Sequence, residues 1–209
     1  MINTIARSFY YPSLGYNVLL EKIGYTKWWN EVEVTINDNK KIILLGALPF
    51  KSMLARMKAE GVKRVISLNE KHELKSGILK LPQLDDYKAF DIERIEINVC
   101  DFTGAPSIEE IETCLNFIEN SPGKIYVHCK AGRCRSALIV AAALVKFENK
   151  GTKEAFEEIK QKRHHIVFHG VQWRRLEEFK QKVPMASNCL TTAIPYLVME
   201  DPIRGMITS

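Results

Sequence analysis

The fold of this chain is decided by residues 125–136, IYVHCKAGRCRS, and by the apolar run ALIVAAALV at residues 137–145. The first part is apolar and rich in β-branched and aromatic residues, so it predicts a strand that ends at Cys129. A glycine-containing loop then leads to Arg135, where a helix-forming run begins. Because this run is apolar nearly all round, its helix should be buried against a sheet.

The loop from Lys130 to Arg135 predicts a site for a tetrahedral oxyanion. Its backbone N–H groups can point inward beside the positive end of the helix dipole. In such surroundings the Cys129 thiolate is favoured, and reactive cysteines of this kind have pKa values of roughly 3.5 to 7.5. The guanidinium of Arg135 can hold two phosphoryl oxygens and stabilise the charge that they gain in the transition state. The sequence therefore indicates a nucleophile, Cys129, and a phosphate ligand, Arg135.

The pattern His128-Cys129, five residues, then Arg135-Ser136 resembles the phosphate-binding loop of the cysteine-dependent protein tyrosine phosphatases, dual-specificity branch. The resemblance implies an α/β fold of the protein tyrosine phosphatase type, with a central, mostly parallel twisted sheet flanked by helices. The alternative interpretation is a buried structural cysteine at a strand end. That alternative leaves the glycine, the arginine and the helix start unexplained.

Composition favours one globular domain with extensions. The chain has 209 residues, 46% of them hydrophobic and 26% charged. A net charge of +5 suits an anionic substrate or membrane surface and falls short of a nucleic-acid-binding signature. Five cysteines without a CxxC pair favour a reducing compartment. His164, His165 and His169 have no cysteine pair beside them, so they do not form a zinc signature.

Three segments are expected: an extension at residues 1–27, a phosphatase domain at 28–183 and a tail at 184–209. The first twenty residues contain Arg7 and no acidic residue, which indicates a weak mitochondrial presequence, a membrane-surface anchor or an ordinary extension. No apolar run of about 18 residues occurs, so a membrane-spanning helix is not predicted.

Periodicity and turn residues predict the elements of the domain. A hairpin at 31–36 and 42–45 comes first, and a polar, irregular segment is expected at 79–90. Ser107 and Glu110 form a capping-box pattern at the start of a helix. The remaining expected elements are a helix from Gly46 through Met57 closed by Gly61, strands at 62–68 and 95–99, and helices at 136–147, 152–162 and 172–183.

A thiolate nucleophile needs a proton donor for the departing oxygen. Asp101 is the predicted acid, because it follows the expected strand 95–99 at the sheet edge that also carries Cys129. Asp85, Asp86 and Asp91 are alternatives in a less defined segment. We expect attack by Cys129, then hydrolysis of a cysteinyl-phosphate with Asp101 as base, without metal or cofactor.

Two residues close to Cys129 in the sequence, Ser136 and His128, can support the thiolate or the loop. Ser136 can donate a hydrogen bond to Cys129 and help it leave, or it can cap the following helix. His128 is expected to be a buried residue that braces the loop, because a thiolate stabilised by the loop needs no separate base.

Further motifs narrow the resemblance, which covers residues 28–182. LLGALP at 44–49, SLNE at 67–70 with Glu73, DFTGAP at 101–106 and VHCKAGR at 127–133 are similar to the mitochondrial phosphatidylglycerophosphate phosphatases. This implies a lipid substrate on the pathway to cardiolipin, and peripheral contact with the inner mitochondrial membrane. The residues alone establish only a phosphomonoester. A protein tyrosine or dual-specificity phosphatase acting on phosphoproteins, and a non-catalytic phosphate-binding module, therefore remain alternatives.

The same resemblance implies that the substrate phosphate is bound by the loop residues Lys130, Ala131, Gly132, Arg133 and Cys134. Glu70 and Glu73 resemble the family's acidic loop, which shapes the pocket; the alternative is a solvated pair of carboxylates.

Two positions depart from the family pattern, which has serine in place of Cys134 and Arg-Pro in place of His169-Gly170. The proximity of Cys134 to Cys129 in the sequence raises the hypothesis of an oxidative disulfide. The alternative, which we favour, is that Cys134 is simply a small residue of the loop. A positive rim for an anionic surface is also expected. It would consist of Lys130, Arg133, Lys162, Arg163, His164 and His165.

Overall fold

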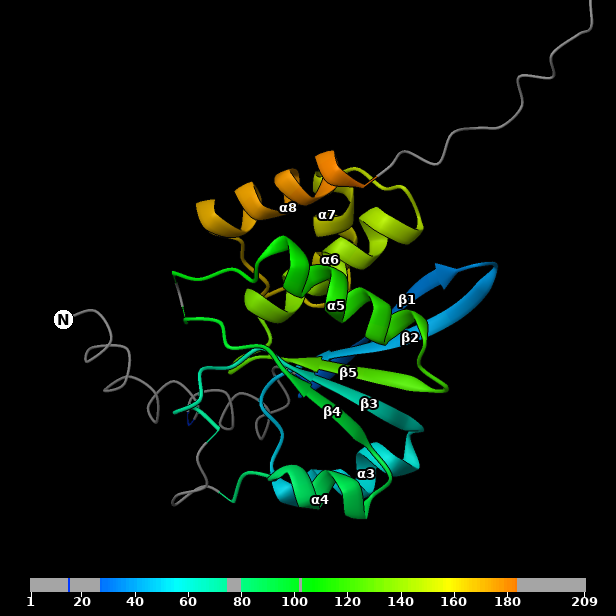
Figure 1. Cartoon of the computed structure of the whole chain (residues 1–209), viewed down its shortest axis with the longest axis vertical. Coiled ribbons are helices and arrows are strands. Elements are labelled where there is room, and N and C mark those ends of the chain that lie inside the picture. The colour runs from blue at the N-terminus through cyan, green and yellow to red at the C-terminus, as the bar shows by residue number, and fades with distance from the viewer. Residues whose placement is uncertain (1–14, 16–26, 75–79, 102, 184–209) are drawn as a thin grey trace, which may run out of the picture.

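The computed structural model describes residues 15, 27–74, 80–101 and 103–183. These residues form an α/β domain around one five-stranded sheet in the order β1-β2-β5-β3-β4 (Figure 1). β1 and β2 are antiparallel, and the other neighbouring strands are parallel. Apart from residues 15 and 27, the expected extension and tail lie outside the described residues.

The elements follow one another as the sequence pattern predicts, with a few shifts. The strands are β1 Trp29–Ile36, β2 Asn39–Gly46, β3 Val62–Ser67, β4 Glu93–Glu96 and β5 Lys124–His128. The helices are a 3-10 turn η1 at Lys51–Met53, α3 Leu54–Ala59, α4 Leu84–Ala89, α5 Ile108–Glu119, α6 Arg135–Phe147, α7 Thr152–Lys162 and α8 Gly170–Lys182.

Helices cover both faces of the sheet. α5, α6, α7 and α8 lie on one face, and α3 and α4 lie on the other (Figure 1). α6 is the central helix of the larger layer, and every residue from Arg135 to Val145 is buried. This confirms the prediction that the apolar run after the phosphate loop packs into the core. On the opposite face a smaller cluster contains Trp28, Trp29, Leu54, Tyr87 and Tyr126.

Local signals set several element ends as predicted. The β1–β2 hairpin turns at Asn37 and Asp38, which both have positive φ, a conformation that asparagine and aspartate tolerate well. Gly61 has φ +85° after α3 and closes that helix. Ser107 and Glu110 form the predicted capping box at the start of α5.

Three expectations about the elements are wrong. The expected helix at Gly46 is the end of β2, and helical structure begins only at Lys51, because Gly46 pairs with His128 in the sheet. The segment 79–90 is not wholly irregular, since Gln83 and Asp86 cap the short helix α4. The fourth strand occupies Glu93–Glu96 rather than 95–99, because its pairing with β3 ends at Ser67.

The topology determines where a site can form. The carboxyl ends of β2, β3, β4 and β5 meet at one sheet edge, because these strands are parallel. β5 lies in the middle of the sheet, so the loop that follows it opens at the centre of this edge. Open α/β sheets bind ligands at such positions. Within the described part of the chain, no helix combines the length and apolar character needed to cross a bilayer.

Candidate active site

The loop between β5 and α6 is tightly held at Gly132. This residue has φ +67°, and a Cβ added to it would lie 2.4 Å from the carbonyl oxygen of Gly46. Glycine is therefore required here for both its backbone conformation and its lack of a side chain. The loop brings Cys129, Arg135 and the N-terminus of α6 to one point.

Cys129 is buried and surrounded by groups that favour its thiolate. The Ser136 hydroxyl lies 3.3 Å from Cys129 Sγ, in the predicted hydrogen bond. Burial alone would raise the pKa of this thiol. The positive charge of Arg135 and hydrogen bonds from the Ser136 hydroxyl and the Ser136 and Arg133 backbone N–H groups outweigh burial and hold the pKa below its ordinary value. Cys129 therefore has the electrostatics of a nucleophile.

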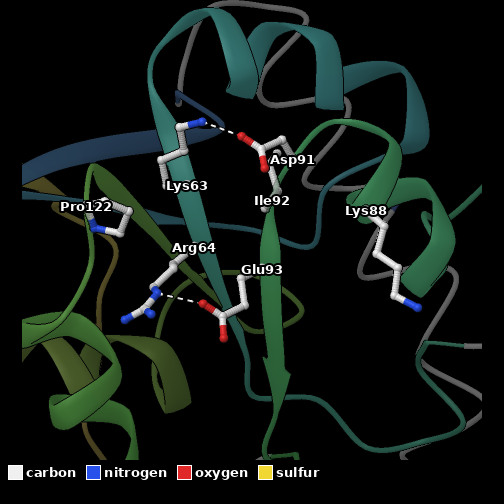
Figure 2. A pocket seen from close by; sticks show the side chains of 7 residues that line it. All are labelled: Lys63, Arg64, Lys88, Asp91, Ile92, Glu93 and Pro122. Carbon is white, nitrogen blue, oxygen red and sulfur yellow. Dashed lines mark hydrogen bonds and ion pairs between the residues drawn. The ribbon is translucent and has the colours of Figure 1, made fainter.

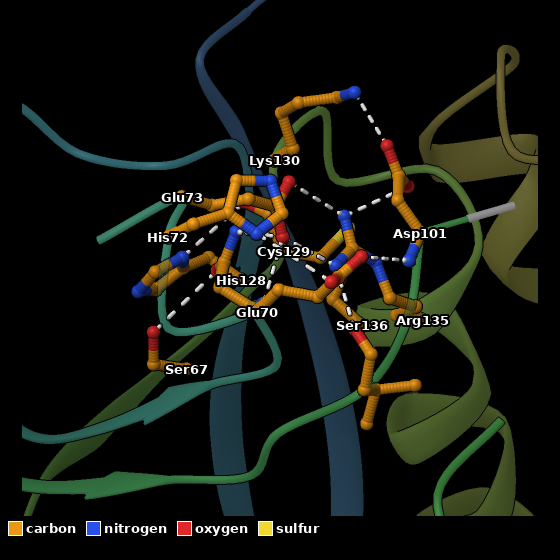
Figure 3. A network of polar contacts seen from close by, with 12 residues as sticks. Ser67, Glu70, His72, Glu73, Asp101, His128, Cys129, Lys130, Arg135 and Ser136 are labelled. Carbon is orange, nitrogen blue, oxygen red and sulfur yellow. Dashed lines mark hydrogen bonds and ion pairs between the residues drawn. The ribbon is translucent and has the colours of Figure 1, made fainter. Parts of the chain in front are cut away.

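Arg135 is almost completely buried and bridges two carboxylates (Figure 3). Its Nη1 lies 2.7 Å from Glu73 Oε2 and its Nη2 lies 3.2 Å from Glu73 Oε1. Nη1 also donates to the Val99 carbonyl at 3.0 Å, and Nη2 donates to Asp101 Oδ1 at 2.8 Å. Burial acts to lower the pKa of this guanidinium, but Cys129, Glu73 and Asp101 raise it above its ordinary value. Arg135 is thus fixed in its charged form.

Asp101 lies between the two cations of the site. Its carboxylate forms ion pairs with Arg135 and Lys130, and its backbone N–H donates to Glu70 Oε1 at 3.0 Å (Figure 3). The expected position of Asp101 directly after a strand is wrong, because β4 already ends at Glu96. The chain then runs four residues further, and the contacts with Glu70 and Lys130 hold Asp101 beside the loop.

Glu70 and Glu73 contact the predicted site residues Asp101 and Arg135, and the interpretation of them as a solvated pair is wrong. Glu73 is only 1% exposed, and its Oε2 also accepts from the Glu70 N–H at 2.8 Å. Glu70 Oε2 lies 3.5 Å from His72 Nδ1. The sequence reasoning missed His72, although its position between the two glutamates was a usable signal. This short segment therefore connects Arg135, Asp101 and an imidazole.

His128 is buried, as predicted. Its Nδ1 lies 3.3 Å from the Cys129 carbonyl oxygen. Burial, aided by the nearby charge of Arg94, lowers the pKa of His128 to about 3, so the ring is neutral at physiological pH. A buried neutral ring that contacts the Cys129 carbonyl fits a bracing role better than the role of a base.

Cys134 precedes Arg135 as the N-cap residue of α6 and is half-buried. Burial, together with the neighbouring Cys129 and Asp101, raises the pKa of its thiol to about 12. Among the described cysteines Cys134 is a free thiol, as are Cys100, Cys114 and Cys129.

The expected positive rim is only partly present. Lys162 and His164 are exposed, and Arg133 and His165 are partly exposed. Lys130 and Arg163 are 4% and 3% exposed, so neither can lie on a rim. Lys130 is directed into the site by Asp101, and Arg163 is held behind the phosphate loop by backbone carbonyls.

The alternative acids lie in other parts of the fold. Asp91 pairs with Lys63 near the amino ends of β3 and β4, in a pocket of about 540 Å³ that also contains Arg64 and Glu93 (Figure 2). Asp85 and Asp86 lie in α4, and Asp86 pairs with Lys51. Asp91 therefore lies at the end of the sheet opposite to Cys129, and the other two aspartates lie in helix α4. This leaves Asp101 as the candidate acid.

A cysteine with a lowered pKa, an arginine that follows it after five intervening residues, and an aspartate at the same sheet edge define a class of enzyme. Residues 43–182 match the family described as the dual specificity phosphatase catalytic domain. The chain belongs to this family of cysteine-dependent phosphatases.

Individual relatives are similar over most of the chain. Phosphatidylglycerophosphate phosphatase PTPMT1 of Arabidopsis thaliana is 36% identical over 203 residues, which cover 95% of this chain and 56% of that protein. Phosphatidylglycerophosphatase and protein-tyrosine phosphatase 1 of Rattus norvegicus is 33% identical, covering 86% of this chain and 91% of that protein. A crystal structure of PTPMT1 in complex with PI(5)P is 32% identical with a TM-score of 0.67, covering 75% of this chain and 97% of that one.

Proposed function

We propose that this chain is a phosphomonoesterase that converts phosphatidylglycerophosphate to phosphatidylglycerol through a cysteinyl-phosphate. The observation that carries the reaction is the meeting of Cys129, Arg135 and Asp101 at one sheet edge. The substrate assignment is supported by relatives named as phosphatidylglycerophosphate phosphatases that match nearly the whole chain. A PTPMT1 structure with a bound phosphoinositide supports a lipid ligand for this type of site.

In the first step the substrate phosphoryl group binds where the loop N–H groups and Arg135 converge. Its oxygens compete with the Asp101 carboxylate for Arg135 and Lys130, because all of these groups are anions seeking the same two cations. Released from these cations, Asp101 takes up a proton from solvent and donates it to the leaving oxygen. The Cys129 thiolate attacks phosphorus, the phosphorus–oxygen ester bond breaks, and the lipid leaves as an alcohol.

In the second step water attacks the phosphorus of the cysteinyl-phosphate. Asp101, now a carboxylate, removes a proton from this water, and inorganic phosphate leaves as the Cys129 thiolate re-forms. The Ser136 hydroxyl at 3.3 Å stabilises the departing thiolate. Arg135 stabilises the charge on the equatorial oxygens in both transition states.

The remaining predicted residues orient this machinery. Lys130 and the N–H groups of Ala131, Gly132, Arg133 and Cys134 bind the phosphoryl group. Glu73 fixes the plane of the Arg135 guanidinium through two hydrogen bonds. Glu70 holds the backbone of Asp101. All these roles are part of the proposal.

The remaining assignments also belong to this proposal. Residues 28–183 form the phosphatase domain, flanked by an extension and a tail. The enzyme acts at the surface of an anionic membrane, and we place it in mitochondria at the inner membrane, where its lipid substrate would be met. The exposed Lys162 and His164, which flank Arg163 in the sequence, are the basic residues that we assign to this membrane contact.

The main alternative substrate is a phosphoprotein, since the relative from Rattus norvegicus carries both activities in its name. A phosphate-release assay on the full chain should compare phosphatidylglycerophosphate in vesicles with phosphotyrosine and phosphothreonine peptides. We expect faster turnover of the lipid and none above background with Cys129→Ser. Comparable or faster peptide turnover would reject the lipid assignment, and activity that survives in Cys129→Ser would reject the mechanism.

Vesicle composition tests the membrane part separately. Turnover should rise when an anionic phospholipid is added to a neutral carrier lipid, and Lys162→Gln should reduce this gain. Equal binding and turnover on neutral and anionic vesicles would contradict a surface-charge contribution.

A further inference from the structure

Arg163 is a buried cation whose described partners are all neutral oxygens. Its side chain is inside the domain, with the residue 3% exposed. Nε donates to the Gly132 carbonyl at 2.8 Å, and Nη2 donates to the Ala131 carbonyl at 3.2 Å. Nη1 donates to the Lys27 carbonyl at 3.1 Å and to Asn30 Oδ1 at 2.7 Å. Among the described residues no carboxylate forms an ion pair with it, which is unusual because burying an unpaired charge is costly.

The two loop carbonyls that Arg163 holds belong to the phosphate loop. A trans peptide is planar, so its C=O and the following N–H point in opposite directions. When Arg163 draws the Ala131 and Gly132 carbonyls toward itself, the N–H groups of Gly132 and Arg133 are turned away from it. The Arg133 N–H is one of the groups that lower the pKa of Cys129. Arg163 therefore sets the direction of an N–H that stabilises the nucleophile.

The neighbouring carbonyls are held from outside the loop as well. The Lys130 carbonyl accepts from the Leu48 N–H at 3.2 Å, and the Arg133 carbonyl accepts from the Val167 N–H at 3.1 Å. Thus four consecutive loop carbonyls accept hydrogen bonds from donors outside the loop. Arg163 donates to the two in the middle, those of Ala131 and Gly132. A loop with all four carbonyls directed outward presents its N–H groups to an anion on the other side.

Steric and electrostatic observations agree with this role. A Cβ at Gly132 would lie 2.9 Å from Arg163 Nη2, so the loop and the guanidinium are in tight contact. Burial lowers the pKa of Arg163 to about 10, while the Cys129 thiolate acts in the opposite direction. The group therefore keeps its charge near neutral pH, and that charge is stabilised by an anion at Cys129.

We propose that Arg163 is a positioning residue, which fixes the phosphate loop in its anion-binding conformation and favours the Cys129 thiolate without contacting the substrate. This inference rests on the proposed phosphatase function, for which it names an additional requirement. It corrects the expectation that Arg163 belongs to a surface rim.

The test uses the full chain with Arg163→Lys, which keeps the charge but cannot serve all four acceptors, and Arg163→Met, which removes the charge. Lys162→Met is the matched control, because it changes the adjacent, exposed cation. Asn30→Asp is a further variant that leaves the loop intact and gives Arg163 a carboxylate partner. Circular dichroism and a thermal melt establish which variants are folded.

Two measurements report on the loop without requiring the lipid substrate: the pH dependence of Cys129 alkylation by iodoacetamide, and the affinity for inorganic phosphate. In the folded Arg163 variants we expect the alkylation midpoint to rise by about one pH unit and phosphate affinity to fall about 10-fold. Asn30→Asp should shift both in the same direction by a smaller amount, and Lys162→Met should change neither.

The proposal would be overturned by folded Arg163 variants that keep the wild-type pH midpoint of alkylation and bind phosphate within about two-fold of the wild-type affinity. If both Arg163 variants fail to fold, an unchanged profile in Asn30→Asp overturns it instead. The outcome is separable from the proposed function. A wild-type chain that releases no phosphate from any ester, with alkylation still dependent on Arg163, would refute the function and leave the positioning role intact.

Discussion

The buried pair between Glu73 and Arg135 allows a quantitative prediction. Glu73→Gln keeps the shape of the side chain and removes its charge. Glu73 Oε2 accepts from Arg135 Nη1 at 2.7 Å, from the Glu70 N–H at 2.8 Å and from Asn69 Nδ2 at 3.3 Å, while Oε1 faces Arg135 Nη2 at 3.2 Å. An amide can supply the acceptor at only one of these two places. Its NH₂ group must then face an N–H donor.

Removing one partner of a buried ion pair costs about 3–5 kcal/mol. We expect Glu73→Gln to lower the free energy of unfolding by about 3 kcal/mol, near the lower end of this range, because Asp101 still neutralises part of the Arg135 charge. A domain with a total stability of about 5–15 kcal/mol remains folded after such a loss, so the free energy of unfolding can be measured by urea denaturation.

Glu70→Gln is the matched control. The Glu70 side chain is 17% exposed, and an amide oxygen can still accept from the Asp101 N–H. Its loss should not exceed about 1 kcal/mol. If Glu73→Gln destabilises the chain by no more than Glu70→Gln does, the reasoning about a buried, mutually dependent pair is refuted.

Three further predictions concern the acid, the buried histidine and the second loop cysteine. Asp101→Asn should lower kcat/KM for alkyl phosphates by about 10²–10⁴-fold and for p-nitrophenyl phosphate far less, because nitrophenolate leaves without a proton; equal losses in steady-state assays would contradict its role as acid. In the folded chain the buried ring of His128 stays neutral, because its pKa is lowered to about 3. In the unfolded chain the same ring binds a proton below about pH 6.5. The free energy of unfolding should therefore fall as the pH drops from 6.5 toward 3, by up to about 1.4 kcal/mol per pH unit. Denaturation at several pH values should show a shallower dependence of this free energy on pH in His128→Asn. An unchanged dependence would count against this assignment. Peroxide should oxidise Cys129 to a sulfenic acid. The Cys134 thiol should then condense with it, which releases water and forms a disulfide that mass spectrometry can detect. Absence of this bridge from the oxidised wild type would reject the redox hypothesis, and Cys134→Ser is its control.

The phosphate loop was predictable because its signals are contiguous. Cys129, Gly132, Arg135 and the apolar run lie within one strand, loop and helix, whose geometry is set by local backbone rules. The environment of Glu73 was harder to predict. The sequence could not distinguish a solvated carboxylate from one that is only 1% exposed and paired with an arginine 62 residues away. Such pairings are formed by the topology of the sheet.

Asp101 was the predicted acid for a reason that proved incorrect. The sequence suggested a strand end, but the residue is positioned by contacts with Glu70 and Lys130 after an extended segment. The helix expected from Gly46 failed for a related reason. A side chain at Gly46 would collide with Tyr126 Oη, at 2.3 Å from a Cβ, so its glycine reflects tertiary packing rather than helix initiation.

Arg163 shows a different limit of sequence reasoning. Charged residues are exposed by default, and nothing in the pattern around residue 163 indicates burial. The acceptors that make burial tolerable come from residues 27–30 and 131–132, which are distant in the sequence. Only the assembled fold identifies this side chain as part of the loop's support.

The central position of β5 has a consequence for how the enzyme would lose activity. Its strand neighbours are β2 and β3, and the helix that follows its loop is buried along nearly its full length. The amide hydrogens of β5 and α6 should therefore exchange with solvent only when the whole domain opens. Heat inactivation and global unfolding should then follow a single curve, without an earlier stage in which the fold survives and the phosphate loop has melted.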